Sequence, residues 1–200
     1  LFTGNANAQN FPSKPIRVIV PYSPGGSTDV VFRILAPRLT EILGTSVIVE
    51  NRPGGSSTIG LDLAAKSAPD GYTLGIPNIT FGANPSLMKN MPFNTERDLV
   101  PVSLVSIVTL VLTVHPSVPA KTVKDLIALA KAKPGSLNYG SAGNASANHL
   151  ATERFNYMAG IKMVHIPYKG GGPAVVSVVG GETAVLMATI PSSIQHFEAK

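Results

Sequence analysis

Cysteine is absent from the 200-residue sequence, and charged residues make up only 14% of it. Without cysteine the chain has no disulfide, no thiolate metal site and no cysteine nucleophile. The longest apolar run, residues 104–114, is too short to span a membrane and is rich in β-branched residues. Lysine and arginine are scattered and not interleaved with aromatics. The net charge of +5 therefore predicts a mild preference for acidic ligands, and neither a nucleic-acid partner nor membrane insertion.

What the chain does contain suits a folded α/β protein. Hydrophobic residues make up 44% of it, and 200 residues suit one large or two small domains. Near the start, Ala6-Asn7-Ala8 precedes Gln9, which places small residues where signal peptidase requires them. We interpret residues 1–8 as the tail of a cleaved secretory signal; the alternative is an arbitrary start.

Apolar periodicity and turn residues predict strands that alternate with helices. Strands are expected at 15–22, 46–50, 73–76, between 99 and 114, and at 137–141, 163–168 and 183–189. Helices are expected at 28–43, 57–67, 122–133, 144–160 and 191–199, and further helices begin at 84 and at 171. Thr122 and Asp125 are expected to form the cap at the start of the helix 122–133. This alternation predicts the α/β class with parallel sheets, whose ligands bind at the carboxyl ends of the strands.

The stretch "VPYSPGGSTDVVFRIL" (20–35) places two glycines where a strand turns into a helix. It lacks the lysine of a P-loop and the third glycine of a dinucleotide fingerprint. Such a turn can hold a carboxylate with backbone N–H groups, a hydroxyl and the helix dipole. In the alternative interpretation Gly25 and Gly26 only make a tight turn, and Ser27 or Thr28 caps the helix. Separately, Asp29 is expected to support the turn by accepting from its N–H groups.

A second turn, "NYGSAGNASANHL" (138–150), resembles a nucleophile elbow without matching it. Tyr139 stands where that motif requires its first glycine, two residues before Ser141. His149 and Glu153 lie four residues apart on one helix face, but two ligands without a third make no zinc site. The sequence therefore predicts no metal, no cofactor and no enzyme.

Several motifs together resemble one family. They are "KPIRVIVPYSPGGSTDVVFRILAPRL", "VIVENRPGGSSTIG", "PDGYTLGI", "LNYGSAGNASANHLATERF" and "VHIPYKGGGPAVVSVVGGE". From about residue 12 onward, the chain is similar to the substrate-binding proteins of tripartite tricarboxylate transporters, called the Bug or TctC family. The resemblance implies a two-lobed "Venus flytrap" receptor of the bacterial periplasm, monomeric at full length. It would bind a small carboxylate, such as a di- or tricarboxylate, an amino acid or an aromatic acid, and deliver it to a membrane permease.

The resemblance also implies where the ligand binds. Ligand-binding residues carried over from the family are Tyr22, Ser23, Gly26, Ser27, Thr28, Asp29, Thr80, Phe81, Ser141, Ala142, Gly143, Ser146, His149 and Tyr168. The expected organisation is a signal remnant (1–8), a first α/β lobe (9–104) and a second (105–200), with the sheet of the first lobe completed by residues beyond Lys200. One departure is Ala184, where the family usually has Asp after the second-lobe helix.

Two alternatives from other classes stay open. One is a ligand-sensing module whose closed form docks on a signalling partner, which shares every sequence feature of the receptor. The other is an α/β hydrolase using Ser141 or Ser27, which the missing elbow glycine disfavours.

Overall fold

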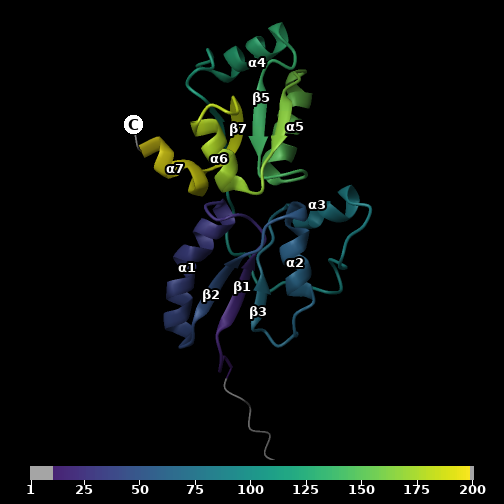
Figure 1. Cartoon of the computed structure of the whole chain (residues 1–200), viewed down its shortest axis with the longest axis vertical. Coiled ribbons are helices and arrows are strands. Elements are labelled where there is room, and N and C mark those ends of the chain that lie inside the picture. Colours follow the sequence, from purple (N-terminus) through teal and green to yellow (C-terminus); the bar gives the residue numbers. More distant parts are fainter. Residues whose placement is uncertain (1–10, 199–200) are drawn as a thin grey trace, which may run out of the picture.

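The computed structural model describes residues 11–198, and the predicted secretory remnant lies outside them. Two sheets, each with its own helices, form two lobes (Figure 1). The first lobe has a parallel sheet of order β2-β1-β3, made of β1 (Ile16–Val20), β2 (Val47–Asn51) and β3 (Thr73–Gly75). Its helices are α1 (Ser27–Leu43), the short 3₁₀ helix η1 (Gly55–Ser57), α2 (Thr58–Ala65) and α3 (Thr80–Leu87). With β1 in the centre, right-handed crossovers place α1 and α2 on opposite faces of the sheet.

The second lobe has a four-stranded sheet of order β4-β7-β5-β6. Its elements are β4 (Leu110–Val114), α4 (Val123–Ala132), β5 (Asn138–Ser141), α5 (Ala147–Ala159), β6 (Val164–Pro167), α6 (Gly171–Val179), β7 (Val185–Thr189) and α7 (Ile190–Glu198). Strand β5 pairs in parallel with β6 and β7, whereas β4 runs antiparallel to β7. The predicted α/β class is confirmed, and β4 is the one strand of the described chain that departs from the parallel arrangement.

Each lobe has its own hydrophobic core. In the first lobe Val18 of β1 packs with Phe32 of α1. In the second lobe Tyr139 of β5, Leu126 of α4 and Val185 of β7 pack together and are almost wholly buried. Burial of each such side chain stabilises the fold by about 2 kcal/mol. These cores hold the strands in place, so the loops at their carboxyl ends lie on rigid supports.

The helix ends test several expectations. The capping box of Thr122 and Asp125 at the start of α4 is confirmed, and α5 ends at Gly160, which is left-handed. The cap proposed in the alternative interpretation of the first turn, Ser27 or Thr28, is wrong, because the N-cap of α1 is Gly26 and no side chain caps the helix. The first N–H groups of α1 therefore have no side-chain acceptor from the cap residue.

Two boundaries also differ from expectation. Helix α3 begins at Thr80, four residues earlier than expected. Only Leu110–Val114 of the apolar stretch 99–114 is a strand. Residues 99–109 belong to no helix and no strand, and most of their apolar side chains are exposed, with Val100 at 84% and Ile107 at 87%. No helix among residues 11–198 is long and apolar enough to cross a membrane.

Candidate ligand-binding site

A cavity of about 680 Å³ lies where the two lobes meet, with residues from both in its wall. Three helices contribute their first residue to this wall: Ser27 of α1, Ala147 of α5 and Gly171 of α6. The N-terminal N–H groups of a helix have no partner within the helix, and the helix dipole makes that end positive. The wall can therefore bind an anion without a cationic side chain.

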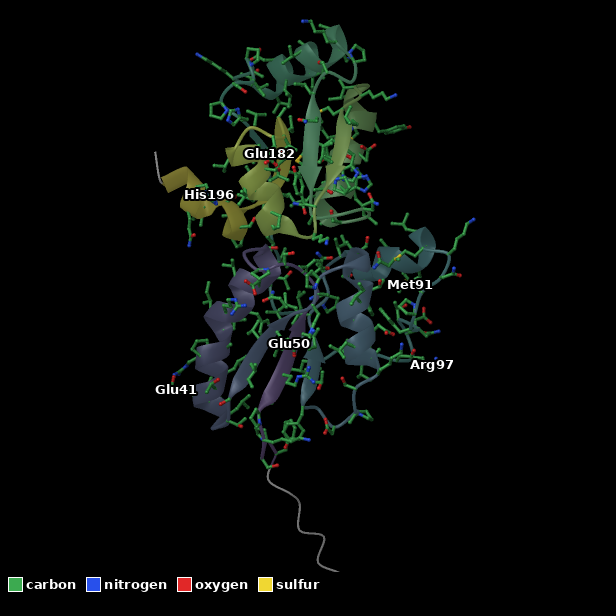
Figure 2. The ribbon with its side chains drawn as sticks, in the orientation of Figure 1. Glu41, Glu50, Met91, Arg97, Glu182 and His196 are labelled. Carbon is green, nitrogen blue, oxygen red and sulfur yellow. The ribbon has the colours of Figure 1, made fainter. Side chains whose placement is uncertain are left out.

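Charged side chains are absent from the wall of this cavity, as far as residues 11–198 show. Figure 2 shows Glu41 and Arg97 on the outer flanks of the first lobe, away from the junction with the second. No cluster of three or more potential metal ligands occurs in the same described part of the chain. The wall instead offers hydroxyls, amides, backbone groups and apolar side chains.

The predicted site residues fall into two groups. Those that line the cavity are Tyr22, Gly26, Ser27, Thr28 and Ala142. Those that lie outside its wall are Ser23, Asp29, Thr80, Phe81, Ser141, Gly143, Ser146, His149 and Tyr168. The assignment of both groups as ligand-binding residues stays a prediction. Several residues of the second group make hydrogen bonds that support the wall.

Tyr22 follows β1, and its side chain is supported by a hydrogen bond between its hydroxyl and a residue outside the cavity wall. Its hydroxyl lies 3.3 Å from Thr80 Oγ1, which lies 3.5 Å from Ser57 Oγ. Burial raises the pKa of Tyr22, so the ring is neutral at physiological pH. Thr80 is buried, and Phe81 stacks on Phe93 with ring centroids 6.4 Å apart. Thr80 thus supports a wall residue.

Asp29 holds the first turn together. One carboxylate oxygen accepts the Gly25 N–H at 2.9 Å, and the other accepts from Arg33 Nε and Asn51 Nδ2, both at 2.9 Å. Asn51 Nδ2 also donates to the carbonyl of Tyr22 at 3.0 Å. The scaffolding role expected for Asp29 is confirmed, because its bonds tie the turn to α1 and β2.

The opposite wall is the turn between β5 and α5, residues 141–146, which we call the 141–146 turn. Ser141 is fully buried; its hydroxyl donates to the Gly143 carbonyl and accepts the Gly143 N–H, both at 3.1 Å. Ser146 is the N-cap of α5 and accepts the His149 N–H at 3.3 Å. Gly143 and Ala145 have φ of +124° and +59°, conformations that side chains disfavour. Side-chain and backbone bonds therefore keep this turn in an uncommon shape.

Sequence reasoning missed His165 of β6, whose Nε2 lies 2.6 Å from Ser141 Oγ. The parallel register of β5 and β6, in which Tyr139 faces His165, brings the two together. A serine–histidine pair is one part of a hydrolytic site, but this serine is buried and lies outside the cavity wall. Within residues 11–198 no carboxylate bonds His165, so the third member of a triad is absent from the described chain.

Other wall residues were also missed. Asn148 lines the cavity while its amide donates to the Met187 carbonyl of β7, and Thr189 and Gly171 complete this side. Asn148 and Gly171 come after β5 and β6, and Thr189 is the last residue of β7, so all three lie toward the carboxyl ends of parallel strands of the second sheet. The rule that ligands bind at the carboxyl ends of parallel strands could have found them.

Direct contacts join the lobes beside the cavity. The Ser23 N–H donates to the Lys169 carbonyl at 3.3 Å, and Ser56 Oγ donates to the Asn144 carbonyl at 2.6 Å. Glycines 170 and 172 lie so near the first turn that a Cβ on them would come 2.8 Å from Ser23 N and 2.5 Å from the Pro24 carbonyl oxygen. Tyr168, just before, packs on the core of α6 and β7. The loop after β6 thus contacts the first lobe through its backbone.

Comparison with protein families gives one match, a tripartite tricarboxylate transporter family receptor (TctC), over residues 31–199. Protein BugT of Bordetella pertussis is 42% identical over 195 residues, which is 96% of this chain and 60% of BugT. A protein encoded in the tcbD-tcbE intergenic region of Pseudomonas sp. strain P51 is 34% identical over 201 residues. The chain spans about 60% of the length of these curated relatives.

Solved structures with similar folds include the periplasmic binding protein BugD, which aligns with a TM-score of 0.85 and 28% identity, over 94% of this chain and 63% of its own. A periplasmic transporter aligns with a TM-score of 0.89 and 40% identity, over 94% of this chain and 64% of its own. Rpa4515 of R. palustris with adipate aligns with a TM-score of 0.88 and 33% identity, over 95% and 64%. MatC of Rhodopseudomonas palustris with bound malate aligns with a TM-score of 0.88 and 25% identity, over 94% and 65%. The fold of this chain is therefore that of periplasmic binding proteins.

Proposed function

Because the chain belongs to the tripartite tricarboxylate transporter family receptors (TctC), we propose that it is part of a periplasmic receptor that binds a small carboxylate between its lobes. The observation that carries this proposal is the cavity wall, which has three helix N-termini and no charged side chain in the described residues. Adipate in Rpa4515 and malate in MatC support a carboxylate of this size. The closed lobes would then be recognised by a membrane permease of the tripartite type.

The mechanism of binding follows from the contacts at the junction. One lobe binds the anion through the N–H groups at the start of α1, and the 141–146 turn and the start of α5 close over it. Closure removes water from the site, which strengthens each hydrogen bond to the carboxylate. The backbone contacts between the loop after β6 and the first turn hold the closed arrangement.

Catalysis is not part of this proposal. Ser141 already bonds Gly143 and His165, and its side chain has no exposed surface from which to attack a substrate. The matched family consists of receptors, which supports the same conclusion.

A thermal-shift screen of the whole protein tests the ligand class. Adipate, malate, citrate, acidic amino acids and nicotinate are compared with sugars and ATP. Binding stabilises a protein by RT ln(1 + [L]/Kd), so a ligand at a thousand times its Kd adds about 4 kcal/mol. We expect stabilisation by at least one carboxylate and little by sugars or ATP, since neutral donors suit one small anion and not a polyphosphate.

Two matched variants locate the binding site in the same screen. Gly26→Val places methyl groups in the wall at the start of α1, so we expect the carboxylate shift to disappear. Gly82→Val makes the same change on α3, where a Cβ meets nothing within 4 Å, and should keep the shift. Stabilisation by sugars or nucleotides alone, or a carboxylate shift that survives Gly26→Val, would contradict the proposal.

A further inference from the structure

Two histidines outside the cavity wall lie directly behind the 141–146 turn. His149 of α5 and His165 of β6 stack with ring centroids 4.0 Å apart and planes inclined by 16°. The ring of Tyr139 on β5 continues the stack, 4.9 Å from His165. Three neighbouring elements thus place two imidazoles in van der Waals contact under one wall of the candidate site.

Both imidazoles hydrogen-bond to the turn. His165 Nε2 lies 2.6 Å from Ser141 Oγ, and Ser141 in turn bonds the backbone of Gly143. His149 Nδ1 accepts the backbone N–H of Ala145 at 3.0 Å. Ala145 has a φ of +59°, a left-handed conformation that costs free energy for a residue with a Cβ. The bond from Ala145 to His149 offsets part of that cost.

The Ala145 bond requires neutral His149. Nδ1 accepts only through its lone pair, and a proton there would face the Ala145 N–H and turn the attraction into repulsion. A second imidazolium 4.0 Å away would add like-charge repulsion. The shape of this wall therefore depends on the charge of the pair.

The titratable groups that face the pair are Tyr139 of β5 and Glu153 of α5. The Tyr139 hydroxyl donates to Glu153 Oε1 at 2.5 Å, and burial raises the pKa of Tyr139, so this hydroxyl stays protonated. Burial lowers the pKa of His149 and of His165, and His149 lowers that of His165 further, while Glu153 partly opposes both effects. Both imidazoles are consequently neutral at neutral pH.

We propose that His149 and His165 are positioning residues that hold the 141–146 turn in its ligand-binding shape only while His149 is neutral, so that acid weakens carboxylate binding. This inference rests on the proposed function. A His149 that contacted the ligand would have the opposite effect, because an imidazolium attracts a carboxylate. The sign of the pH dependence therefore separates a positioning residue from a contact residue.

The test measures adipate affinity of the whole protein by calorimetry from about pH 8 to about pH 5. We expect adipate to bind about tenfold more weakly at the acid end, beyond any change caused by its own protonation. His149→Asn retains an acceptor oxygen near the position of Nδ1 and does not titrate, so the ratio of its affinities at pH 8 and pH 5 should be smaller than that of the wild type. His115→Asn is the control, because His115 bonds Ser117 and not the 141–146 turn. This variant should lose as much adipate affinity in acid as the wild type does.

Amide exchange of the ligand-free protein gives a second, independent readout. The protection factor of the Ala145 N–H, which is the ratio of its intrinsic to its observed exchange rate at the same pH, should be high at pH 8 and should fall as His149 is protonated. In His149→Asn it should stay high in acid. His165→Gln removes the like charge that opposes protonation of His149, so the loss of affinity in acid should move to higher pH. If His149→Asn does not fold, the comparison of wild type with His165→Gln decides the inference.

Failure of the two proposals would look different. If adipate binds at no pH, adipate is excluded as a ligand, and the exchange of Ala145 still decides whether the turn depends on His149. If adipate binds equally at all pH values, more tightly in acid, or with the same acid loss in His149→Asn, the positioning role is overturned while the receptor function stands.

Discussion

Asp29 is a buried carboxylate that accepts three hydrogen bonds, from Gly25, Arg33 and Asn51. Burial by itself would raise the pKa of Asp29, but the bonds from Arg33, Gly25 and Asn51 outweigh it and lower the pKa. A carboxylate whose pKa is lowered by folding stabilises the fold at pH values above its pKa in the unfolded chain. This contribution is lost as the pH falls through its pKa in the folded protein. At the scale of one residue, the shape of the first turn therefore depends on the charged carboxylate of Asp29, although Asp29 does not line the cavity.

Asp29→Asn tests this role, because an amide nitrogen would replace one acceptor and face a donor. We expect a loss of about 2 kcal/mol of unfolding free energy, measured by urea denaturation at neutral pH. The loss should shrink in acid, where wild-type Asp29 is itself protonated. Glu41→Gln, in an exposed pair with Arg38, should change the free energy by less than about 0.5 kcal/mol. Equal effects of the two variants would show that the Asp29 network is not a support.

At the scale of elements, the loop between β6 and α6 meets the loop between β1 and α1 backbone to backbone. Gly170 has a φ of +146°, and both Gly170 and Gly172 lie against residues 23–25 of the first lobe. A glycine loop allows this approach because it has no Cβ to separate the two chains. The lobes thus touch through their backbones directly beside the wall residues Gly26 and Gly171.

Gly172→Ala adds a methyl group that would lie 2.5 Å from the Pro24 carbonyl oxygen, so the lobes must separate to admit it. We expect a larger radius of gyration by X-ray scattering and about tenfold weaker carboxylate binding, with the melting temperature of the ligand-free protein little changed. Gly82→Ala on α3, where a Cβ meets nothing within 4 Å, serves as the control. Unchanged affinity in Gly172→Ala would mean that this contact does not take part in closure.

On the scale of the whole molecule, the sequence carries a net charge of +5, but no charged side chain of the described residues lines the cavity. The exposed ion pairs Arg38–Glu41 and Lys14–Asp70 are examples of charged side chains on the surface of the first lobe and outside the cavity wall. Salt screens exposed charges over about 10 Å at 0.1 M, whereas hydrogen bonds from neutral donors in an enclosed site are affected much less.

Carboxylate affinity should consequently depend weakly on ionic strength. Between about 0.02 M and about 0.5 M sodium chloride we expect Kd to rise by no more than about threefold, measured by calorimetry at neutral pH. The association rate should fall more than the affinity, since the net charge acts on the approach of an anion. A tenfold or greater rise in Kd would point to a direct ion pair and contradict a wall of neutral donors.

Local patterns in the sequence were enough to predict most elements. The Thr122–Asp125 capping box, the left-handed Gly160 and the alternation of strand and helix depend on residues near one another in the chain. The apolar stretch 99–109 shows the limit of such patterns. Its β-branched residues favour a strand, but a strand also needs a neighbour to take its hydrogen bonds, and no described residue pairs with it.

The sequence by itself determined the α/β class, the first turn at Gly25–Asp29 and the motifs that indicate the receptor family. Only the tertiary structure decided which of these residues line a common cavity and which stand behind them. Ser141 and His165 are 24 residues apart and bond because β5 and β6 pair in one register, and His149 joins them from α5. Contacts of this kind depend on the packing of whole strands and helices, which local propensity does not specify.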